Sequence, residues 1–200
     1  IYIAHNPISN LKLASGIAPV TDLIQAGVTV GLATDSVASN NNLDMFEESR
    51  TAALLQKMRT GDATQFTIEQ ALKTMTIEGA KALGMDDQIG SLEVGKQADF
   101  LIIQPKGKVH LYPEENMLSH LIYAVKGNDV KDVYIAGEQV VKDGQVLTMD
   151  EYSLQLTGRR TNDHFIICII LECICTIFLY KYFRQVSKSI LYCIVKIIGS

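Results

Sequence analysis

An apolar run that ends at an acidic residue places the tightest constraint on how this chain can fold. Residues 28–34 read Val-Thr-Val-Gly-Leu-Ala-Thr and are followed at once by Asp35 and Ser36. A run that is apolar and partly β-branched is typical of a strand buried on both faces of a parallel sheet. A helical pattern over residues 20–24, ended by Gly27, comes directly before it. This order predicts an α/β chain in which Asp35 lies at the carboxyl end of a strand.

Two helices are predicted after this strand. The first runs from about Leu43 to Arg59, because acidic residues lie in its first turn, basic residues in its last turn and Gly61 just beyond it. The second runs from about Ile68 to Leu83, and Thr67 and Gln70 have the spacing of a capping box at its start. The first 87 residues are therefore predicted to alternate between strands and helices.

The pattern changes from helix to strand after residue 88. Short apolar segments predict strands at 98–103, 133–135 and 139–141. The last two are separated by Ala136-Gly137-Glu138, which is typical of a hairpin connection. Residues 88–149 are thus expected to form a separate region that is rich in β-structure.

Residue usage changes again at about residue 150. The apolar run from Phe165 to Tyr180 has 16 residues, fewer than the roughly 20 that a membrane-spanning helix needs. Glu172 near its middle would cost about 2.5–3.5 kcal/mol on insertion. We expect residues 150–200 to be an aberrant apolar extension. A membrane-associating segment over residues 165–183 is the alternative.

Composition excludes two kinds of site. The formal net charge of -4 does not provide the concentrated excess of Lys and Arg that nucleic-acid binding requires, so a small-molecule ligand is expected. Residues 1–167 contain no disulfide framework and no thiolate metal ligand. A metal in that part must use histidine or carboxylate ligands, because the chain's four cysteines are Cys168, Cys173, Cys175 and Cys193.

Asp35 is the candidate for metal binding and catalysis. If the preceding strand belongs to a parallel barrel, its last side chains lie at the carboxyl-end face, where such barrels build active sites. A carboxylate there can bind a divalent metal and accept a proton from metal-bound water. The alternative for an Asp that precedes a Ser is a simple turn cap.

Three stretches in order resemble the amidohydrolase superfamily. They are His-Asn-Pro-Ile-Ser-Asn-Leu-Lys-Leu at 5–13, Gly-Leu-Ala-Thr-Asp-Ser at 31–36 and Gly-Ser-Leu-Glu-Val-Gly-Lys-Gln-Ala-Asp-Phe at 90–100. The branch that they resemble most is the methylthioadenosine/S-adenosylhomocysteine deaminases, over about residues 1–149. The resemblance implies that residues 1–87 are the C-terminal part of a (β/α)8 TIM-type barrel. Residues 88–149 would be the C-terminal share of a small β-sandwich, followed by the apolar tail.

The resemblance also assigns roles to polar residues. Asp35 matches an Asp that binds the metal and contacts the substrate or the attacking water. Ser36 either orients Asp35 or is a turn hydroxyl. The implied metal is divalent, with zinc expected, although one carboxylate does not choose between zinc, iron and manganese. The loop after the first strand is expected to line the pocket, with metal ligation by its histidine as the alternative; its polar residues are His5, Ser9, Asn10 and Lys12.

The other ligands that the resemblance implies are absent from this chain. They are a His-x-His pair, a further His and a Glu that moves protons to the leaving group. No two of the chain's histidines stand two apart; they are His5, His110, His120 and His164. The chain begins at Ile1, within a predicted strand, and we expect the natural N-terminus to lie upstream. This chain alone is therefore expected to be inactive.

The function implied by the resemblance is hydrolytic deamination of methylthioadenosine or S-adenosylhomocysteine. The expected partner is a small purine nucleoside, the expected compartment of the parent enzyme is the cytoplasm, and a homo-oligomer is left open. One alternative is another nucleobase deaminase or a chlorohydrolase of the same superfamily. A second is a non-catalytic truncated remnant, held at a membrane by its tail.

Overall fold

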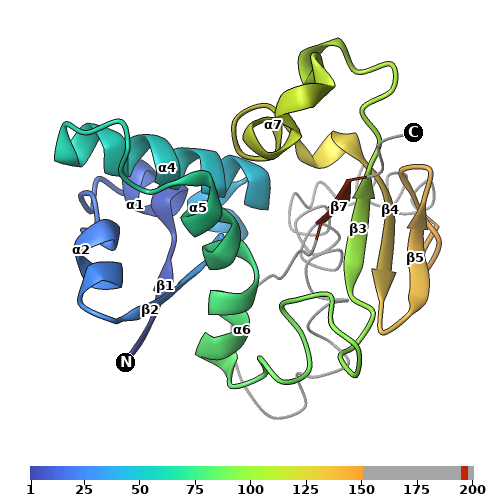
Figure 1. The fold of residues 1–200 in the computed structure, drawn as a ribbon, viewed down its shortest axis with the longest axis horizontal. Helices are drawn as coiled ribbons and strands as arrows, with labels where there is room; N and C mark the ends of the chain where they lie inside the picture. Colours follow the sequence, from blue (N-terminus) through green and yellow to red (C-terminus); the bar gives the residue numbers. More distant parts are fainter. Residues whose placement is uncertain (151–194, 198–200) are drawn as a thin grey trace.

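The computed structural model describes residues 1–150 and 195–197 of the chain (Figure 1). Its strands form a two-stranded sheet of order β1-β2 and a five-stranded sheet of order β6-β5-β4-β3-β7. The strands are β1 (Tyr2–His5), β2 (Thr29–Leu32), β3 (Phe100–Ile103), β4 (Val130–Ile135), β5 (Glu138–Lys142), β6 (Gln145–Val146) and β7 (Val195–Ile197). The described part is therefore a mixed α/β structure.

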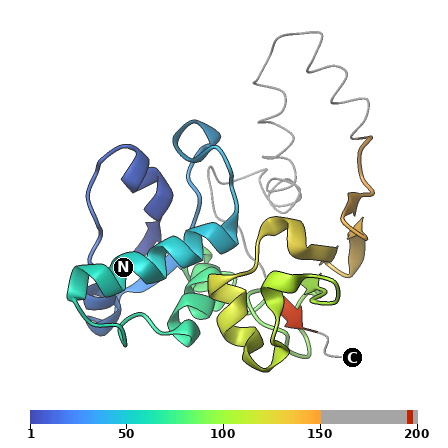
Figure 2. The same ribbon diagram turned by 90° about the horizontal axis from the view of Figure 1, so that it is seen from above.

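Most helices belong to the first half of the described residues. They are α1 (Pro7–Lys12), α2 (Val20–Gln25), α3 (Val37–Asn40), α4 (Met45–Thr60), α5 (Ile68–Met75), α6 (Ile77–Leu83) and α7 (Met117–Tyr123). Single 3-10 turns lie at η1 (Val109–Leu111), η2 (Glu114–Asn116) and η3 (Gly127–Asp129). Figures 1 and 2 both show α5 and α6 between the two sheets.

β1 and β2 pair in parallel, so their carboxyl ends lie at the same edge. His5 stands opposite Leu32, and the Ala33 N–H extends the pairing by donating to the His5 carbonyl at 2.9 Å. Each strand is followed by a short helix, α1 after β1 and α3 after β2. Figure 1 shows β1 running from the N-terminus toward α1. The polar residues after both strands are thereby brought together.

β2 lies against α6 at a contact between two glycines. A Cβ added to Gly31 would lie 2.9 Å from the Cα of Gly79, closer than two carbon atoms approach in a relaxed structure. The absence of side chains at both positions lets the strand and the helix come this close. This contact fixes the distance between β2 and α6.

Side chains from the two sheets share one hydrophobic core. Val30 and Leu32 of β2, Leu101 and Ile103 of β3, and Ile122 of α7 all belong to a single cluster and are at most 4% exposed. Each such side chain contributes about 1.5–3 kcal/mol when it is fully buried. The strand-and-helix region and the β-rich region are therefore packed against each other rather than joined by a free linker.

Several predicted helix ends are confirmed. Gly61 ends α4 in the left-handed conformation, as predicted. Asp44 lies one residue before α4 rather than inside its first turn, and its Oδ1 accepts from the N–H groups of Phe46 at 2.9 Å and Glu47 at 3.4 Å. The capping box of Thr67 and Gln70 is present at the start of α5. The predicted strands at 98–103, 133–135 and 139–141 are found as β3, β4 and β5, slightly shifted.

Two predictions for the helices were wrong. The helix predicted over 68–83 is broken into α5 and α6 at Thr76, whose φ of -127° and ψ of -99° are not helical. The Thr76 hydroxyl donates to the Leu72 carbonyl at 2.7 Å. Through such local bonds threonine competes with the hydrogen bonds of the helix backbone.

The predicted loop after β1 contains a helix, α1. Its first turn begins with Pro7, a favourable first helical residue. α7 was not predicted.

Most of residues 150–200, including the segment 165–183, lies outside the described residues. One strand of this segment is described: β7 pairs in parallel with β3, with Leu101 opposite Val195. Among the residues that the structure describes, no helix is long and apolar enough to cross a bilayer.

The glycine contact gives a test of the packing of β2 on α6. Gly31→Ala should lower the free energy of unfolding by about 1–3 kcal/mol, because the added methyl group overlaps the α6 backbone. Urea unfolding followed by circular dichroism measures this change. Gly127→Ala is the control, since its Cβ would lie 3.4 Å from Asp44 Oδ2, and it should change stability by no more than about 0.5 kcal/mol. Equal losses in the two variants would contradict the packing argument.

Candidate functional site

Polar side chains gather where β1 and β2 end. We call this group the strand-end site; its members are His5, Ser9, Asp35, Ser39, Asn40 and Glu48. β1 supplies His5 as its last residue, and α1 supplies Ser9. Asp35 follows β2, α3 supplies Ser39 and Asn40, and α4 supplies Glu48. The ends of both strands and the helices α1, α3 and α4 therefore meet at one edge of the parallel sheet.

Asp35 is held by two serine hydroxyls. Its Oδ2 accepts from Ser9 Oγ at 2.7 Å and from Ser39 Oγ at 2.9 Å. The bond from Ser9 is the largest cause that lowers the pKa of Asp35. Partial burial raises this pKa, but bonds from Ser39 and from the Ser36 backbone lower it further. Its backbone has a φ of 62°, in the left-handed region that Asp tolerates better than most residues. Asp35 is thus an ionised carboxylate with a defined direction.

The sequence predicts two alternatives for the Ser36 hydroxyl, which either orients Asp35 or belongs to a turn. Ser36 is exposed, and its carbonyl accepts from Ser39 Oγ at 3.2 Å. Sequence reasoning missed Ser39, which stands four residues after Asp35 and lies in α3. It interpreted Ser9 as a residue of the pocket-lining loop, and the structure gives that hydroxyl a bond to Asp35.

Glu48 is the buried acid of the strand-end site. Its side chain is 0% exposed; Oε2 accepts from the Ile8 N–H at 3.2 Å, and Oε1 accepts a short bond from Asn40 Nδ2. Burial raises the pKa of Glu48 to about 8, and the charges of Glu47 and Asp35 add to this, while its two hydrogen bonds oppose it. The sequence had explained Glu48 only by its favourable place in the first turn of a helix.

His5 is neutral and buried. It is 4% exposed, and desolvation lowers its pKa to about 4. Its Nε2 has no hydrogen-bond partner among the described residues. A buried polar atom without a partner costs about 1–3 kcal/mol, which makes this nitrogen available to a ligand at the carboxyl end of β1.

The other residues predicted for the pocket-lining loop support α1. The Asn10 N–H donates to the Asn6 carbonyl at 3.0 Å, and the Asn10 carbonyl accepts from the Ser15 N–H at 2.8 Å. Lys12 Nζ donates to the Ala38 carbonyl at 2.8 Å and to Asn41 Oδ1. Lys12 therefore ties α1 to α3 across the strand ends.

The described residues do not form a complete metal site. No group of three or more His, Cys, Asp or Glu side chains among them is placed to hold a metal ion. A structural or catalytic zinc needs at least three protein ligands. Asp35 can therefore supply one ligand, and the residues described here do not fit a metal by themselves.

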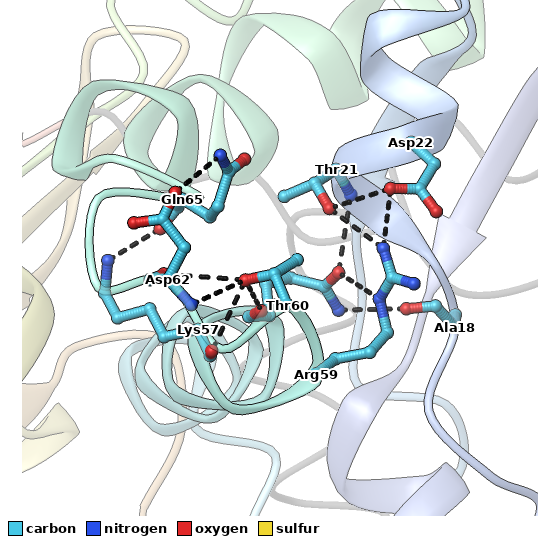
Figure 3. Close-up of polar contacts among 9 residues, drawn as sticks. Ala18, Thr21, Asp22, Lys57, Arg59, Thr60, Asp62 and Gln65 are labelled. Atoms are coloured by element: carbon cyan, nitrogen blue, oxygen red, sulfur yellow. Dashed lines mark hydrogen bonds and ion pairs between the residues drawn. The ribbon is translucent and has the colours of Figure 1, made fainter.

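A second polar cluster lies at the other end of α4 (Figure 3). Gln56, which is 0% exposed, accepts from the Thr21 N–H at 3.4 Å and donates to the Ala18 carbonyl at 2.9 Å. Arg59 forms an ion pair with Asp22 at 2.7 Å. Both polar atoms of the buried amide have partners, so this cluster joins α2 to α4 and offers no free group to a ligand.

The remaining described histidines lie between β3 and β4. His110 Nε2 lies 2.8 Å from Oδ2 of the buried Asp129, and Lys108 Nζ lies 3.2 Å from its Oδ1. His120 Nε2 lies 2.8 Å from the Pro113 carbonyl. Both histidines therefore have partners outside the strand-end site.

Comparison with known proteins gives one family. The model of the amidohydrolase family matches residues 1–140. A 5-methylthioadenosine/S-adenosylhomocysteine deaminase of Bacillus thuringiensis (strain Al Hakam) is 56% identical over 160 residues, which are 80% of this chain and 37% of that protein. The chain therefore spans little more than a third of the length of the curated relatives it matches.

Solved structures that resemble this chain include two zinc-containing hydrolases. An adenosine deaminase from Xanthomonas campestris with bound zinc is 43% identical, with a TM-score of 0.76 over 80% of this chain and 36% of that one. An atrazine chlorohydrolase from Arthrobacter aurescens TC1, complexed with zinc, is 26% identical, with a TM-score of 0.66 over 80% of this chain and 35% of that one. The likeness thus extends over enzymes with different substrates.

Glu48 predicts how stability depends on pH. Its pKa of about 8 exceeds the ordinary 4.5, so the folded chain keeps a proton that the unfolded chain releases. Its contribution is full below about pH 4.5 and is lost as pH rises through about 8. At about 1.4 kcal/mol for each pH unit, the loss is at most about 5 kcal/mol.

The variant Glu48→Gln cannot release this proton. Its free energy of unfolding, measured by urea titration at several pH values, should therefore fall less than that of the wild type between pH 5 and pH 8. Parallel pH curves for the two proteins would show that Glu48 is not a buried acid with a raised pKa.

Proposed function

Because the chain belongs to the amidohydrolase family, we propose that it is part of a metal-dependent hydrolase that deaminates 5-methylthioadenosine or S-adenosylhomocysteine. The observation that carries the proposal is Asp35, ionised and oriented by Ser9 and Ser39 at the carboxyl end of β2. The proposed substrates are those in the names of relatives that are 56% identical to this chain. Because the chain spans 37% of their length, the activity is proposed for the whole enzyme.

The fold supports assigning residues 1–87 to the C-terminal part of a (β/α)8 barrel. β1 and β2 are parallel, and helices connect and cover them, as in a βαβ unit. Residues 88–149 are assigned to the C-terminal share of a small β-sandwich, because β3 to β6 pair antiparallel. Residues 150–200 remain a separate segment in this assignment, from which β7 joins the sheet.

Asp35 is proposed to be both a metal ligand and a catalytic group. The zinc bound in the solved relatives supports a divalent metal. Since the described residues hold one ligand of such a site, no step is assigned to the metal. An ionised carboxylate at this position can accept a proton from water as the water oxygen bonds to the purine ring carbon. The proton released from water passes on to the ring amino group, the bond between that nitrogen and the ring carbon breaks, and the group leaves as ammonia.

Three further residues are proposed to face the substrate. The unpartnered Nε2 of the buried His5 supports a hydrogen bond to a polar atom of the nucleoside. Asn10 of α1 and Ser36, the residue after Asp35, are proposed as weaker contacts. A deaminase or chlorohydrolase acting on a different ring is the second candidate, supported by the 26% identical atrazine chlorohydrolase.

Metal retention tests the role of Asp35 as one ligand of a larger set. The 200-residue chain should keep far less than one zinc per chain after dialysis, measured by mass spectrometry of the metal. The same chain joined to the remaining part of the Bacillus thuringiensis relative should keep close to one. In that fusion, Asp35→Ala should lose zinc and Asp22→Ala should keep it. Stoichiometric zinc in the isolated chain would contradict the proposal that the other ligands lie elsewhere.

Ammonia release tests the substrate. The fusion should release ammonia from 5-methylthioadenosine and S-adenosylhomocysteine faster than from guanine, and it should not dechlorinate atrazine. Asp35→Asn should reduce the rate by roughly 10²–10⁴-fold, because the base that accepts the water proton is removed. A zinc-loaded fusion that acts on guanine but on neither thioether would remove this substrate assignment.

A further inference from the structure

Glu48 joins the segments that follow β1 and β2. Its Oε2 accepts from the Ile8 N–H in the first turn of α1, and its Oε1 accepts from the Asn40 side chain at the end of α3. Glu48 and Asn40 are 0% and 5% exposed. One carboxyl group on α4 thus sets the distance between α1 and α3.

The residues next to these two partners hold Asp35. Ser9 follows Ile8 and Ser39 precedes Asn40, and both hydroxyls donate to Asp35 Oδ2. Two paths therefore lead from Glu48 to the same oxygen, one through α1 and one through α3. Because a helix is stiff over one residue, moving Ile8 or Asn40 moves the adjacent serine with it.

The direction of the Asn40 amide is fixed on its other side. Its Oδ1 accepts from the Leu43 N–H at 2.8 Å and from the Asn42 N–H at 3.1 Å. Its Nδ2 must therefore point toward acceptors, and it donates to Glu48 and to the Thr34 carbonyl at 2.9 Å. The second of these bonds holds the backbone immediately before Asp35.

Stability alone is a poor explanation for Glu48. Burying an ionisable group costs free energy, and well-packed apolar side chains often replace buried charged groups at no loss of stability. What the carboxyl group supplies, and an apolar side chain would not, is two acceptors aimed in different directions. These acceptors serve the two segments that carry Ser9 and Ser39.

We propose that Glu48 is a positioning residue for Asp35, which acts by fixing the two serines whose hydroxyls orient the Asp35 carboxylate. Its importance for catalysis rests on the proposed function of Asp35. Whether Glu48 orients the Asp35 side chain does not depend on that function, because it concerns only contacts within this chain. The two can therefore be tested separately.

The test measures the side-chain rotamer of Asp35 in the labelled 200-residue chain by three-bond NMR couplings at constant pH. The wild type should show one χ1 rotamer. Glu48→Ala removes both acceptors and should give couplings averaged over several rotamers. Glu48→Gln keeps one acceptor and should give an intermediate value. Glu47→Gln, the adjacent first-turn residue, is the matched control and should leave the couplings unchanged.

A second set of variants separates positioning from stability. Ser9→Ala combined with Ser39→Ala should give the same averaging with Glu48 intact, and adding Glu48→Ala to this pair should cause no further change. If Glu48→Ala does not fold, Asn40→Ala and Glu48→Gln replace it, because each removes one path. A folded Glu48 variant in which Asp35 keeps a single rotamer overturns the proposal. Since neither metal nor substrate is added, failure of zinc retention or ammonia release does not alter this outcome.

Discussion

The parallel pairing of β1 with β2 is the constraint on which the rest of the site depends. It places the ends of two strands at one edge, so that α1 and α3 begin side by side. The helix α6 packs against β2 and stabilises this pairing. It comes this close to β2 only because Gly31 and Gly79 lack side chains. A shift of β2 by one residue would turn its buried side chains to the other face and separate Asp35 from Ser9.

The two ends of α4 show how differently buried polar groups are used in this structure. At the C-terminal end, the amide of Gln56 has partners on both its atoms and joins α2 to α4. At the N-terminal end, Glu48 is satisfied, whereas the nearby His5 has a nitrogen without a partner among the described residues. Both clusters hold helices in place, but only the strand-end site leaves a buried polar atom for a ligand. The shared core of β2, β3 and α7 offsets the cost of that atom.

Local features of the sequence predicted the parts of the fold that local interactions determine. The capping box of Thr67 and Gln70 acts over three residues, and Gly61 ends α4; both were recognisable as patterns. Asp35 was also recognisable, because it follows a buried strand directly. The contact from Glu48 to Ile8 spans 40 positions, and that from Ser9 to Asp35 spans 26. No periodicity or spacing rule reports such pairs, so the support of Asp35 emerged only from the packing of α1, α3 and α4.

The surroundings of the two acids in the strand-end site shift their pKa values in opposite directions. Serine hydroxyls lower the pKa of Asp35, whereas burial raises that of Glu48 to about 8. Glu48 therefore takes up a proton at a higher pH than Asp35 does, which limits repulsion between the two carboxylates. Environments that separate the pKa values of two nearby acids give them different tasks. Here the half-buried, ionised Asp35 is the group that can act on a ligand, and Glu48, whose pKa is raised, is the group that can remain buried and hold the helices around it.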